Sequence, residues 1–387
     1  MDKLALYERI AQGENSFTEF KQDISQRSDF AAEMIAFANT EGGKIFVGIE
    51  DDRNIVGVQN PKEIERSIID IARSNCVPRI NPEIESIETD NGIVIVVSIP
   101  IRIGVPFENN SGQCHIRVGS TKRLCSPQER ARLLQSAGLM HVDEIPIQNT
   151  SISDLDFDSF SYYYERIFDQ PLDHADIPIE KMLNNMRFLV TDIAGSQRMS
   201  MAGLLLFGKS PQTFLYNARI SAVRWRGNEP GDEITDRQEI TGRLPNQIEE
   251  AEAFLLRNIR LSTKIDEFKQ TDQYEYPRIA LREAVVNAIA HRDYSLEGAQ
   301  ILLFIFDNRI EIRSPGKLPN SVTLENIRSH YSRPRNENIA RVLFNLGFVN
   351  TLGSGIPRII RLMKEHTGKE PEFENNDPQF VVKLWAE

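Results

Sequence analysis

Cysteine is scarce in this chain: Cys76, Cys114 and Cys125 are its complete set among 387 residues. An odd and sparse set argues against a disulfide scaffold, and no pair has the spacing of a structural zinc site. Apolar runs near the ~18 residues that a membrane-spanning helix needs are absent. The first residues show neither the basic nor the apolar segment of a secretory signal. We therefore expect a cytoplasmic protein with no membrane partner.

Basic residues are outnumbered, with 45 Lys and Arg against 56 Asp and Glu and a formal net charge of -11. This balance opposes indiscriminate binding to nucleic acid through overall charge, although it permits local basic patches. Hydrophobic residues make up 40% and charged residues 26% of the chain, which excludes wholesale disorder and collagen-like structure. The length exceeds one ordinary domain and suits two or three.

The pattern of apolar residues predicts a mixed α/β (α+β) fold in three parts. These are a first module over 1–140, a connecting α/β region over 157–275, and an α/β sandwich over 276–387, with a polar linker at 141–156.

In the first module, apolar residues at helical spacing predict a helix over 30–39 that Asp29 caps and Gly42-Gly43 ends. Short apolar runs predict strands at 44–49, 55–58 and 93–99, the last buried on both faces.

In the later parts, the same reasoning predicts a helical start near 157, a buried segment at 201–208 and a strand at 220–225. Further on it predicts helices at 244–262 and 281–291, a hairpin over 301–313 that turns at Asp307-Asn308, and a closing strand from 380.

Three acidic residues stand out near the amino end. Glu14 and Glu19 flank one short segment, and Asp51 follows the strand predicted at 44–49. Carboxylates at a strand edge and a nearby loop can converge on Mg²⁺ or Mn²⁺, which take oxygen ligands, and a bound metal can activate water against a phosphodiester. Spacing alone favours a solvated acidic surface over a metal site.

A basic stretch lies within 113–132, where Glu129 is the sole acidic residue. It contains Arg117, Lys122, Arg123, Arg130 and Arg132. In an acidic protein such a cluster suits contact with backbone phosphates. The alternative is a solvated face, or pairing with nearby carboxylates.

Four sequence blocks then resemble the Schlafen/AlbA-like domain over about 8–135. They are Glu14…Glu19-Phe20-Lys21, 36–43, 48–57 and 115–120, in that order. In Schlafen nucleases two Glu and one Asp form a metal-dependent active site. The resemblance carries these roles to Glu14, Glu19 and Asp51, with Asp52 and then Glu50 as alternatives for the last. It implies engagement of nucleic acid more strongly than cleavage.

Near the other end, Glu283, Asn287 and His291 are spaced by four residues, which places them along one face of a helix. Asn can ligate Mg²⁺, Glu can orient or deprotonate water, and His can contact phosphate. The alternative is a polar stripe that faces solvent.

These residues resemble the N-box of the GHKL ATPases. Together with the blocks His291-Arg292-Asp293-Tyr294, Ser314-Pro315-Gly316, Arg333-Pro334-Arg335 and Gly353-Ser354-Gly355, they resemble the RecG C-terminal-like ATPase domain of bacterial transcriptional regulators and ATP-binding proteins that begin with a Schlafen/AlbA-like module.

The resemblance implies that Asn287 ligates magnesium, that Glu283 activates water, and that Gly353, Ser354 and Gly355 approach the phosphates of ATP at a helix N-terminus. Arg333 and Arg335 lie on a loop where they either pair with phosphate or face solvent.

One departure concerns adenine. The GHKL superfamily recognises adenine with an Asp in a DxGxG box, whereas this chain has Ser314-Pro315-Gly316-Lys317 at the matching strand end. Asp307 lies too far upstream to replace it. This departure opposes specific recognition of adenine.

Three functions remain open. The first is a metal-dependent endonuclease for RNA (including tRNA) or DNA, with ATP binding at the last domain controlling cleavage. The second is a non-cleaving, nucleotide-responsive regulator that binds DNA or RNA. The third is an oligomerising scaffold in which both sites are degenerate. Homo-oligomers are common among GHKL proteins, so we also expect one here.

Overall fold

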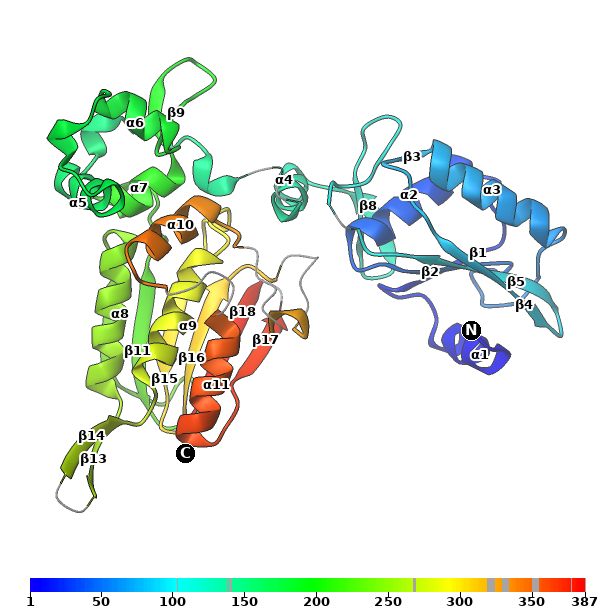
Figure 1. The fold of residues 1–387 in the computed structure, drawn as a ribbon. Helices are drawn as coiled ribbons and strands as arrows, with labels where there is room; N and C mark the ends of the chain where they lie inside the picture. Colours follow the sequence, from blue (N-terminus) through cyan, green and yellow to red (C-terminus); the bar gives the residue numbers. More distant parts are fainter. Residues whose placement is uncertain are drawn as a thin grey trace. The chain divides into compact units, whose positions relative to one another are not determined.

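The computed structural model describes residues 1–102, 104–137, 139, 141–266, 269–318, 324–328, 334–349, 355–376 and 378–386. The chain folds into two compact units, Met1–Met140 and His141–Glu387 (Figure 1). Helices and several sheets alternate along both, so the predicted α/β (α+β) class is confirmed. Within the described residues, no helix combines the length and the apolar character that crossing a membrane requires.

The first unit is built on a four-stranded sheet in the order β1-β2-β5-β4. Its strands are β1 (Thr18–Lys21), β2 (Gly43–Val47), β5 (Gly92–Ile99) and β4 (Glu83–Thr89). Strands β1 and β2 are parallel and the other neighbours are antiparallel. Parallel neighbours need a long crossover connection, and helix α2 (Arg27–Asn39) supplies it.

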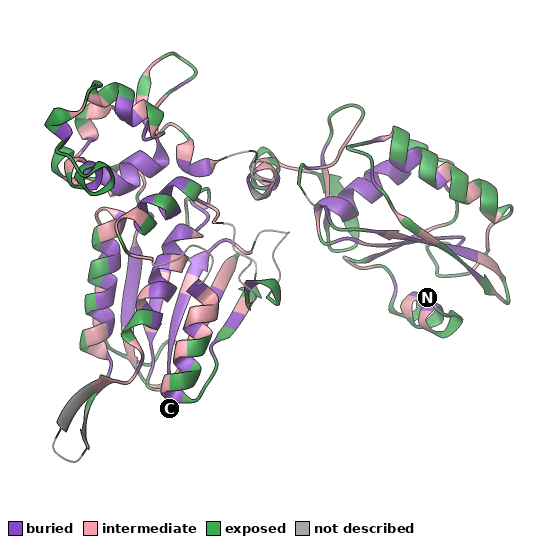
Figure 2. Ribbon diagram, in the orientation of Figure 1, coloured by how far each residue is buried: buried purple, intermediate pink, exposed green. Residues whose placement is uncertain are grey.

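Helices cover both faces of this sheet. On one face, α2 and α3 (Pro61–Ser74) pack on side chains such as Ile45 and Val97. On the other, α1 (Lys3–Gln12) packs on Phe46, Val94 and Val96. Strand β5 is therefore buried on both faces, as its continuous apolar run predicts, and α2 is buried from Phe30 to Asn39 (Figure 2).

The remaining elements of the first unit are short. They are β3 (Cys76–Val77), which pairs with β6 (Glu108–Asn109), the antiparallel hairpin of β7 (His115–Val118) and β8 (Thr121–Leu124), and α4 (Pro127–Ser136). The hairpin β7–β8 lies against α2. This contact brings the basic stretch of the sequence onto the helix.

Two local predictions were wrong. Helix α2 begins at Arg27 with Gln26 at its N-cap, so Asp29 lies in the first turn instead of capping the helix. The segment at 55–58 forms isolated bridges, Ile55 to Ile49 and Val58 to Ile93, and not a regular strand.

The second unit opens with short elements around an aromatic cluster of Phe160, Tyr163, Phe188 and Phe207. The elements are η1 (Val142–Glu144), η2 (Ile152–Asp154), α5 (Phe157–Phe168), η3 (Leu172–His174), α6 (Ile179–Asn185), the hairpin of β9 (Leu189–Thr191) and β10 (Gln197–Met199), α7 (Met201–Phe207) and η4 (Pro211–Thr213).

The core of the second unit is a six-stranded sheet in the order β12-β11-β15-β16-β18-β17. Its strands are β12 (Glu233–Ile240), β11 (Ile220–Arg226), β15 (Ile301–Ile305), β16 (Arg309–Pro315), β18 (Gln379–Trp385) and β17 (Glu372–Asn376). Strands β11 and β15 are parallel, and the other neighbours are antiparallel.

Three helices lie side by side across one face of that sheet: α8 (Leu244–Asn258), α9 (Arg278–Ala290) and α11 (Gly355–Thr367) (Figure 1). Helix α10 (Glu337–Asn345), η5 (Asn326–Arg328) and the hairpin of β13 (Leu261–Asp266) and β14 (Lys269–Tyr274) complete the unit. The domain boundary expected between residues 275 and 276 lies inside this unit. Strands β11 and β15 pair in one sheet, although β11 precedes that boundary in the sequence and β15 follows it.

Candidate nucleic-acid and nucleotide sites

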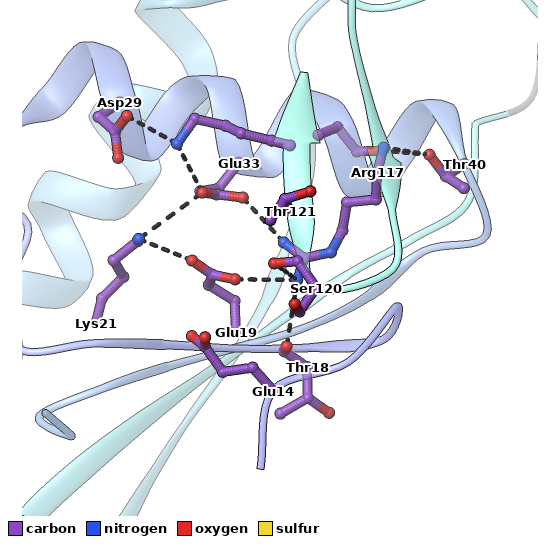
Figure 3. Close-up of polar contacts among 12 residues, drawn as sticks. Glu14, Thr18, Glu19, Lys21, Asp29, Glu33, Thr40, Arg117, Ser120 and Thr121 are labelled. Atoms are coloured by element: carbon purple, nitrogen blue, oxygen red, sulfur yellow. Dashed lines mark hydrogen bonds and ion pairs between the residues drawn. The ribbon is translucent and has the colours of Figure 1, made fainter. Parts of the chain in front are cut away.

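Arg117 of β7 is the centre of a buried ionic network in the first unit (Figure 3). Its Nη2 lies 3.0 Å from Glu19 Oε2, its Nη1 lies 3.0 Å from Glu33 Oε2, and its side chain has 0% exposure. Nη2 also donates to the backbone carbonyls of Asn15 and Ser120, and the guanidinium lies over the Phe37 ring. A planar, five-donor cation suits this many fixed acceptors.

Glu33, in the middle of α2, connects Arg117 to two lysines. Its Oε1 lies 2.7 Å from Lys122 Nζ and 3.7 Å from Lys21 Nζ. Lys21 also lies 2.8 Å from Glu19 Oε1, and Lys122 lies 2.7 Å from Asp29 Oδ1. The network thus balances three carboxylates with three cations, which buried charges require.

Burial raises the pKa of Glu33, against the opposing pull of Lys122. For Lys21, burial opposes the charged form, but the hydrogen bond and charge of Glu19 prevail and raise its pKa.

The expectation that Arg117 contacts nucleic-acid phosphates is therefore corrected, since its guanidinium is enclosed and already bonded. Lys122 is half-buried and pairs with Glu33 and Asp29. Arg123 is exposed and lies 2.7 Å from Glu129, and these contacts hold the pKa of Glu129 at about 2. Of the three predicted phosphate contacts, Arg123 alone presents an exposed guanidinium.

The pKa of Glu14, the first of the predicted catalytic acids, is affected by the charges of the other two. Partial burial raises the pKa of its carboxyl group, the negative charges of Glu19 and Asp51 raise it further, and the hydrogen bond from the backbone N–H of Phe20 opposes them. Figure 3 shows Glu14 beside Glu19. These contacts thus place Glu14 next to Glu19.

As these side chains stand, no group of three or more His, Cys, Asp or Glu in the described ranges is placed to hold a metal ion. Both oxygens of Glu19 are engaged by Arg117 and Lys21. The two alternatives for the last position are engaged as well, because Asp52 accepts from Asn54 and Glu50 accepts from Gln22.

In the second unit, the predicted helix at 281–291 is confirmed as α9, and His291 is its C-cap residue. Glu283 is buried, and its Oε1 accepts from Arg358 Nη1 of α11 at 3.1 Å. Its Oε2 and the Asn287 Nδ2 are buried and have no hydrogen-bond partner among the residues that the structure describes. Burial raises the pKa of Glu283, which Arg358 opposes.

Gly355, the first residue of α11, lies directly on these two orphaned atoms. A Cβ at this position would meet Asn287 Nδ2 at 2.8 Å and Glu283 Oε2 at 3.2 Å. The N-terminus of α11 therefore approaches the polar face of α9 as closely as a glycine allows. Such a helix end favours anions.

At this site His291 is neutral, and Arg335 is held in an ion pair. Burial, and secondarily the Arg335 charge, lower the pKa of His291 to about 4, so its imidazole is neutral at pH 7. Arg335 Nη1 lies 2.7 Å from Asp293, which is buried. That ion pair occupies the guanidinium predicted to meet phosphate.

Other predicted residues fall elsewhere. Arg333, Gly353 and Ser354 lie outside the described residues. Asp307 pairs with Arg224 at the hairpin between β15 and β16, and Ser314, near the other end of β16, donates to the Ala288 carbonyl. Asp307 is thus remote from the strand end where an adenine-reading acid is expected.

Sequence reasoning missed Glu33, Asp29 and Lys21 as members of the ionic network. Glu33 had a signal: it is the one charged residue within the apolar run 30–39. A carboxylate in a fully buried helix face needs a cation. The basic stretch at 113–132 offered such cations.

Comparison with known proteins assigns the units. Residues 14–126 match the family "Schlafen, AlbA_2". Residues 298–384 match the family "Putative ATP-dependent DNA helicase recG C-terminal". The chain joins a Schlafen/AlbA_2 domain to a RecG C-terminal-like domain. Between them, residues 131–220 match a domain of unknown function, DUF8451.

The Schlafen/AlbA_2 and RecG-like pairing characterises a nucleic-acid-related protein with an ATPase-like domain. No curated protein matches the chain.

Among solved structures, the DIP2311 protein from Corynebacterium diphtheriae shares the fold, with 22% identity, a TM-score of 0.50, and coverage of 99% of this chain and 80% of that one. The N-terminal domain of a "Putative ATP-dependent DNA Helicase RecG-related Protein" from Nitrosomonas europaea is 20% identical, covers 33% of this chain and 94% of its own, and has a TM-score of 0.26.

Proposed function

We propose that the protein is a nucleotide-responsive regulator of nucleic acid. A nucleoside triphosphate with Mg²⁺ binds between α9 and α11, and this binding controls how the Schlafen/AlbA_2 domain engages DNA or RNA. The observation that carries the proposal is the pair of orphaned atoms, Glu283 Oε2 and Asn287 Nδ2, against Gly355.

Unpaired buried polar atoms cost free energy, about 1–3 kcal/mol for each group, and a ligand that pairs with them recovers this cost. Carboxylate and amide oxygens suit Mg²⁺, and an amide can turn to exchange its oxygen and nitrogen. The first N–H groups of α11 suit a phosphate. The donor set at this place therefore fits a magnesium–triphosphate group.

Each residue then has a distinct part. Asn287 would hold the metal, which supplies charge neutralisation for the phosphates. Glu283 orients water, and Arg358 holds the Glu283 carboxylate in position at 3.1 Å. His291 is neutral and serves as a hydrogen-bond donor or acceptor. Base selection is expected to be weak, because Ser314 and Gly316 replace the adenine-reading acid.

The test is the thermal unfolding midpoint with and without ATP–Mg²⁺. A ligand that binds the native state alone must stabilise it, so the midpoint should rise in the wild type. It should also rise in Asn246→Ala, which removes an exposed asparagine from α8. Asn287→Ala should abolish the rise, and a chelator should reduce it. An equal rise in all three proteins contradicts the proposal.

A second candidate is metal-dependent cleavage of RNA or DNA at the acidic residues of the first unit. The observation in its favour is that Glu14 lies beside Glu19 at the start of the sheet, where its carboxylate accepts from the Phe20 backbone N–H (Figure 3). Glu14, Glu19 and Asp51 would hold Mg²⁺ or Mn²⁺, and the metal would supply activation of water.

Glu14→Gln tests cleavage better than a change at Glu19, because Glu14 forms none of the ion pairs around Arg117. Incubation of tRNA and DNA with Mn²⁺ should show substrate loss in the wild type and in Glu8→Gln, an exposed control on α1, but not in Glu14→Gln. No metal-dependent loss in any of them, with binding that survives a chelator and weakens with salt, favours the regulator. A protein that binds neither nucleic acid nor ATP favours the oligomerising scaffold.

A further inference from the structure

Two cysteines close the base of the hairpin β7–β8. Cys114 immediately precedes β7 and Cys125 immediately follows β8, and the Cys125 N–H donates to the Cys114 carbonyl at 2.9 Å. Their Sγ atoms are 2.9 Å apart. Residues opposite each other in an antiparallel pair have Cα atoms about 4.5–5.5 Å apart, which lies within the range of disulfides. The backbone already places the two thiols for a bond.

The surroundings distinguish the two sulfurs. Cys114 is buried, and its Sγ accepts from the Asn39 amide at 3.4 Å. The Cys125 thiol donates to the same sulfur, and this hydrogen bond lowers the pKa of Cys114 while it raises that of Cys125. Cys125 is partly exposed and gives access from solvent. Cys114 is therefore the thiol that loses its proton more readily. The neighbouring Cys125 thiol can react with the oxidised form of Cys114 to give a disulfide.

The third cysteine provides an internal comparison. Cys76 on β3 is buried, and burial raises its pKa to about 12. A thiol with so little thiolate is a poor nucleophile.

We propose that Cys114 and Cys125 are a reversible modification site, which a hydroperoxide oxidises to an intramolecular disulfide. The Cys114 thiolate attacks one peroxide oxygen, the O–O bond breaks, and the departing hydroxide or alkoxide takes up a proton to become water or an alcohol. The Cys125 sulfur then attacks the sulfenic sulfur and expels its oxygen, which leaves as water with the Cys125 proton. Two thiols lose two electrons, and the peroxide gains them.

The position of this bond connects it to the ionic network. Arg117 follows Cys114 by three residues on β7, and Lys122 precedes Cys125 by three residues on β8. These are two of the cations that hold Glu33. The disulfide therefore fixes together the two strands that carry the network, and oxidation should raise the thermal midpoint of the first unit.

The experiment treats the full reduced chain with hydrogen peroxide, counts thiols after denaturation, and maps peptides without reduction. Two of the three thiols should disappear, a Cys114–Cys125 peptide should be lighter by two hydrogen atoms, and dithiothreitol should restore all three. Cys76→Ser should form the same link.

Cys125→Ser should form no link, and Cys114 should instead be trapped by a sulfenic-acid reagent, with circular dichroism showing that the variant folds. Three thiols that survive oxidant, a link to Cys76 or to a second chain, or oxidation that dithiothreitol does not reverse would each overturn the proposal.

Discussion

Arg117 donates from Nη2 to Glu19 Oε2 over 3.0 Å, and the arginine side chain has no exposed surface. Glu19 is one of the acids that the sequence resemblance selects for metal binding, yet in the structure it is one end of a buried ion pair. A buried carboxylate without a cation is strongly destabilising, so Glu19 and Glu33 both depend on this guanidinium.

We expect Arg117→Met to lower the free energy of unfolding by about 3–5 kcal/mol, because it leaves two buried carboxylates without their main partner. Urea unfolding of the full chain measures this loss. The control is Arg123→Met on the same hairpin, where an exposed ion pair with Glu129 is removed and little change is expected. Equal effects of the two substitutions would show that the network does not stabilise the unit.

Gly355→Ala should impair nucleotide binding more than folding. The added Cβ would lie 2.8 Å from Asn287 Nδ2, the end of a side chain that can move aside, so the unliganded protein should remain folded. The displaced amide can then no longer serve a ligand. Titration with ATP–Mg²⁺ should show at least tenfold weaker binding, about 1.4 kcal/mol.

Gly298→Ala is the matched control, since nothing lies within 4 Å of its new Cβ. An unchanged affinity for ATP–Mg²⁺ in Gly355→Ala would show that Gly355 is not part of the nucleotide site.

Acid should destabilise the second unit through His291. Its pKa is about 4 in the folded chain against an ordinary value of 6.5, so the unfolded chain binds more protons between these values. The free energy of unfolding should therefore decrease as pH falls from 6.5 toward 4, and this contribution should level off below that. Unfolding curves of the wild type and His291→Asn at several pH values measure how much of the pH dependence His291 contributes. The two proteins should show the same pH dependence if the imidazole is not enclosed.

Asp143 should stabilise the start of α10. Its Oδ2 accepts the N–H groups of Asn338 at 2.8 Å and Ile339 at 3.2 Å. Removal of such a cap costs about 1 kcal/mol, up to about 2. Asp143→Ala should show this loss in urea unfolding.

Asp143→Asn should lose much less, because it keeps an acceptor and removes a carboxylate whose pKa burial raises. A loss in the asparagine variant as large as in the alanine variant would show that the negative charge, rather than the acceptor, stabilises the helix.

Periodicity alone predicts several of the long regular elements of this chain. The run at 93–99 became β5 (Gly92–Ile99), the segment at 281–291 became α9 (Arg278–Ala290), and the hairpin at 301–313 became β15 and β16. Each of these segments carries a long apolar pattern of strand or helix period, which is the main local signal for such elements. The segment at 55–58 failed because its partners, Ile49 and Ile93, supply single bridges and not a ladder.

The candidate sites were less predictable. The sequence identifies Glu19 and Arg117 as charged residues of interest, but it does not show that they lie 3.0 Å apart, since that contact joins β1 to a hairpin almost a hundred residues away. An arginine contacts phosphate only when its guanidinium is exposed. The exposure of Arg117 is set by the packing of the hairpin β7–β8 against α2, which the sequence does not show.

The parallel contact of β11 with β15 has a practical consequence for anyone who isolates the RecG-like region. A fragment that starts at 276 keeps β15 but loses β11, which pairs with it from Ile220 to Arg224. The backbone amides and carbonyls along that side of β15 would then have no partner strand. Such a piece would recruit strands from other molecules and precipitate, whereas one that begins near 141 keeps the whole sheet intact.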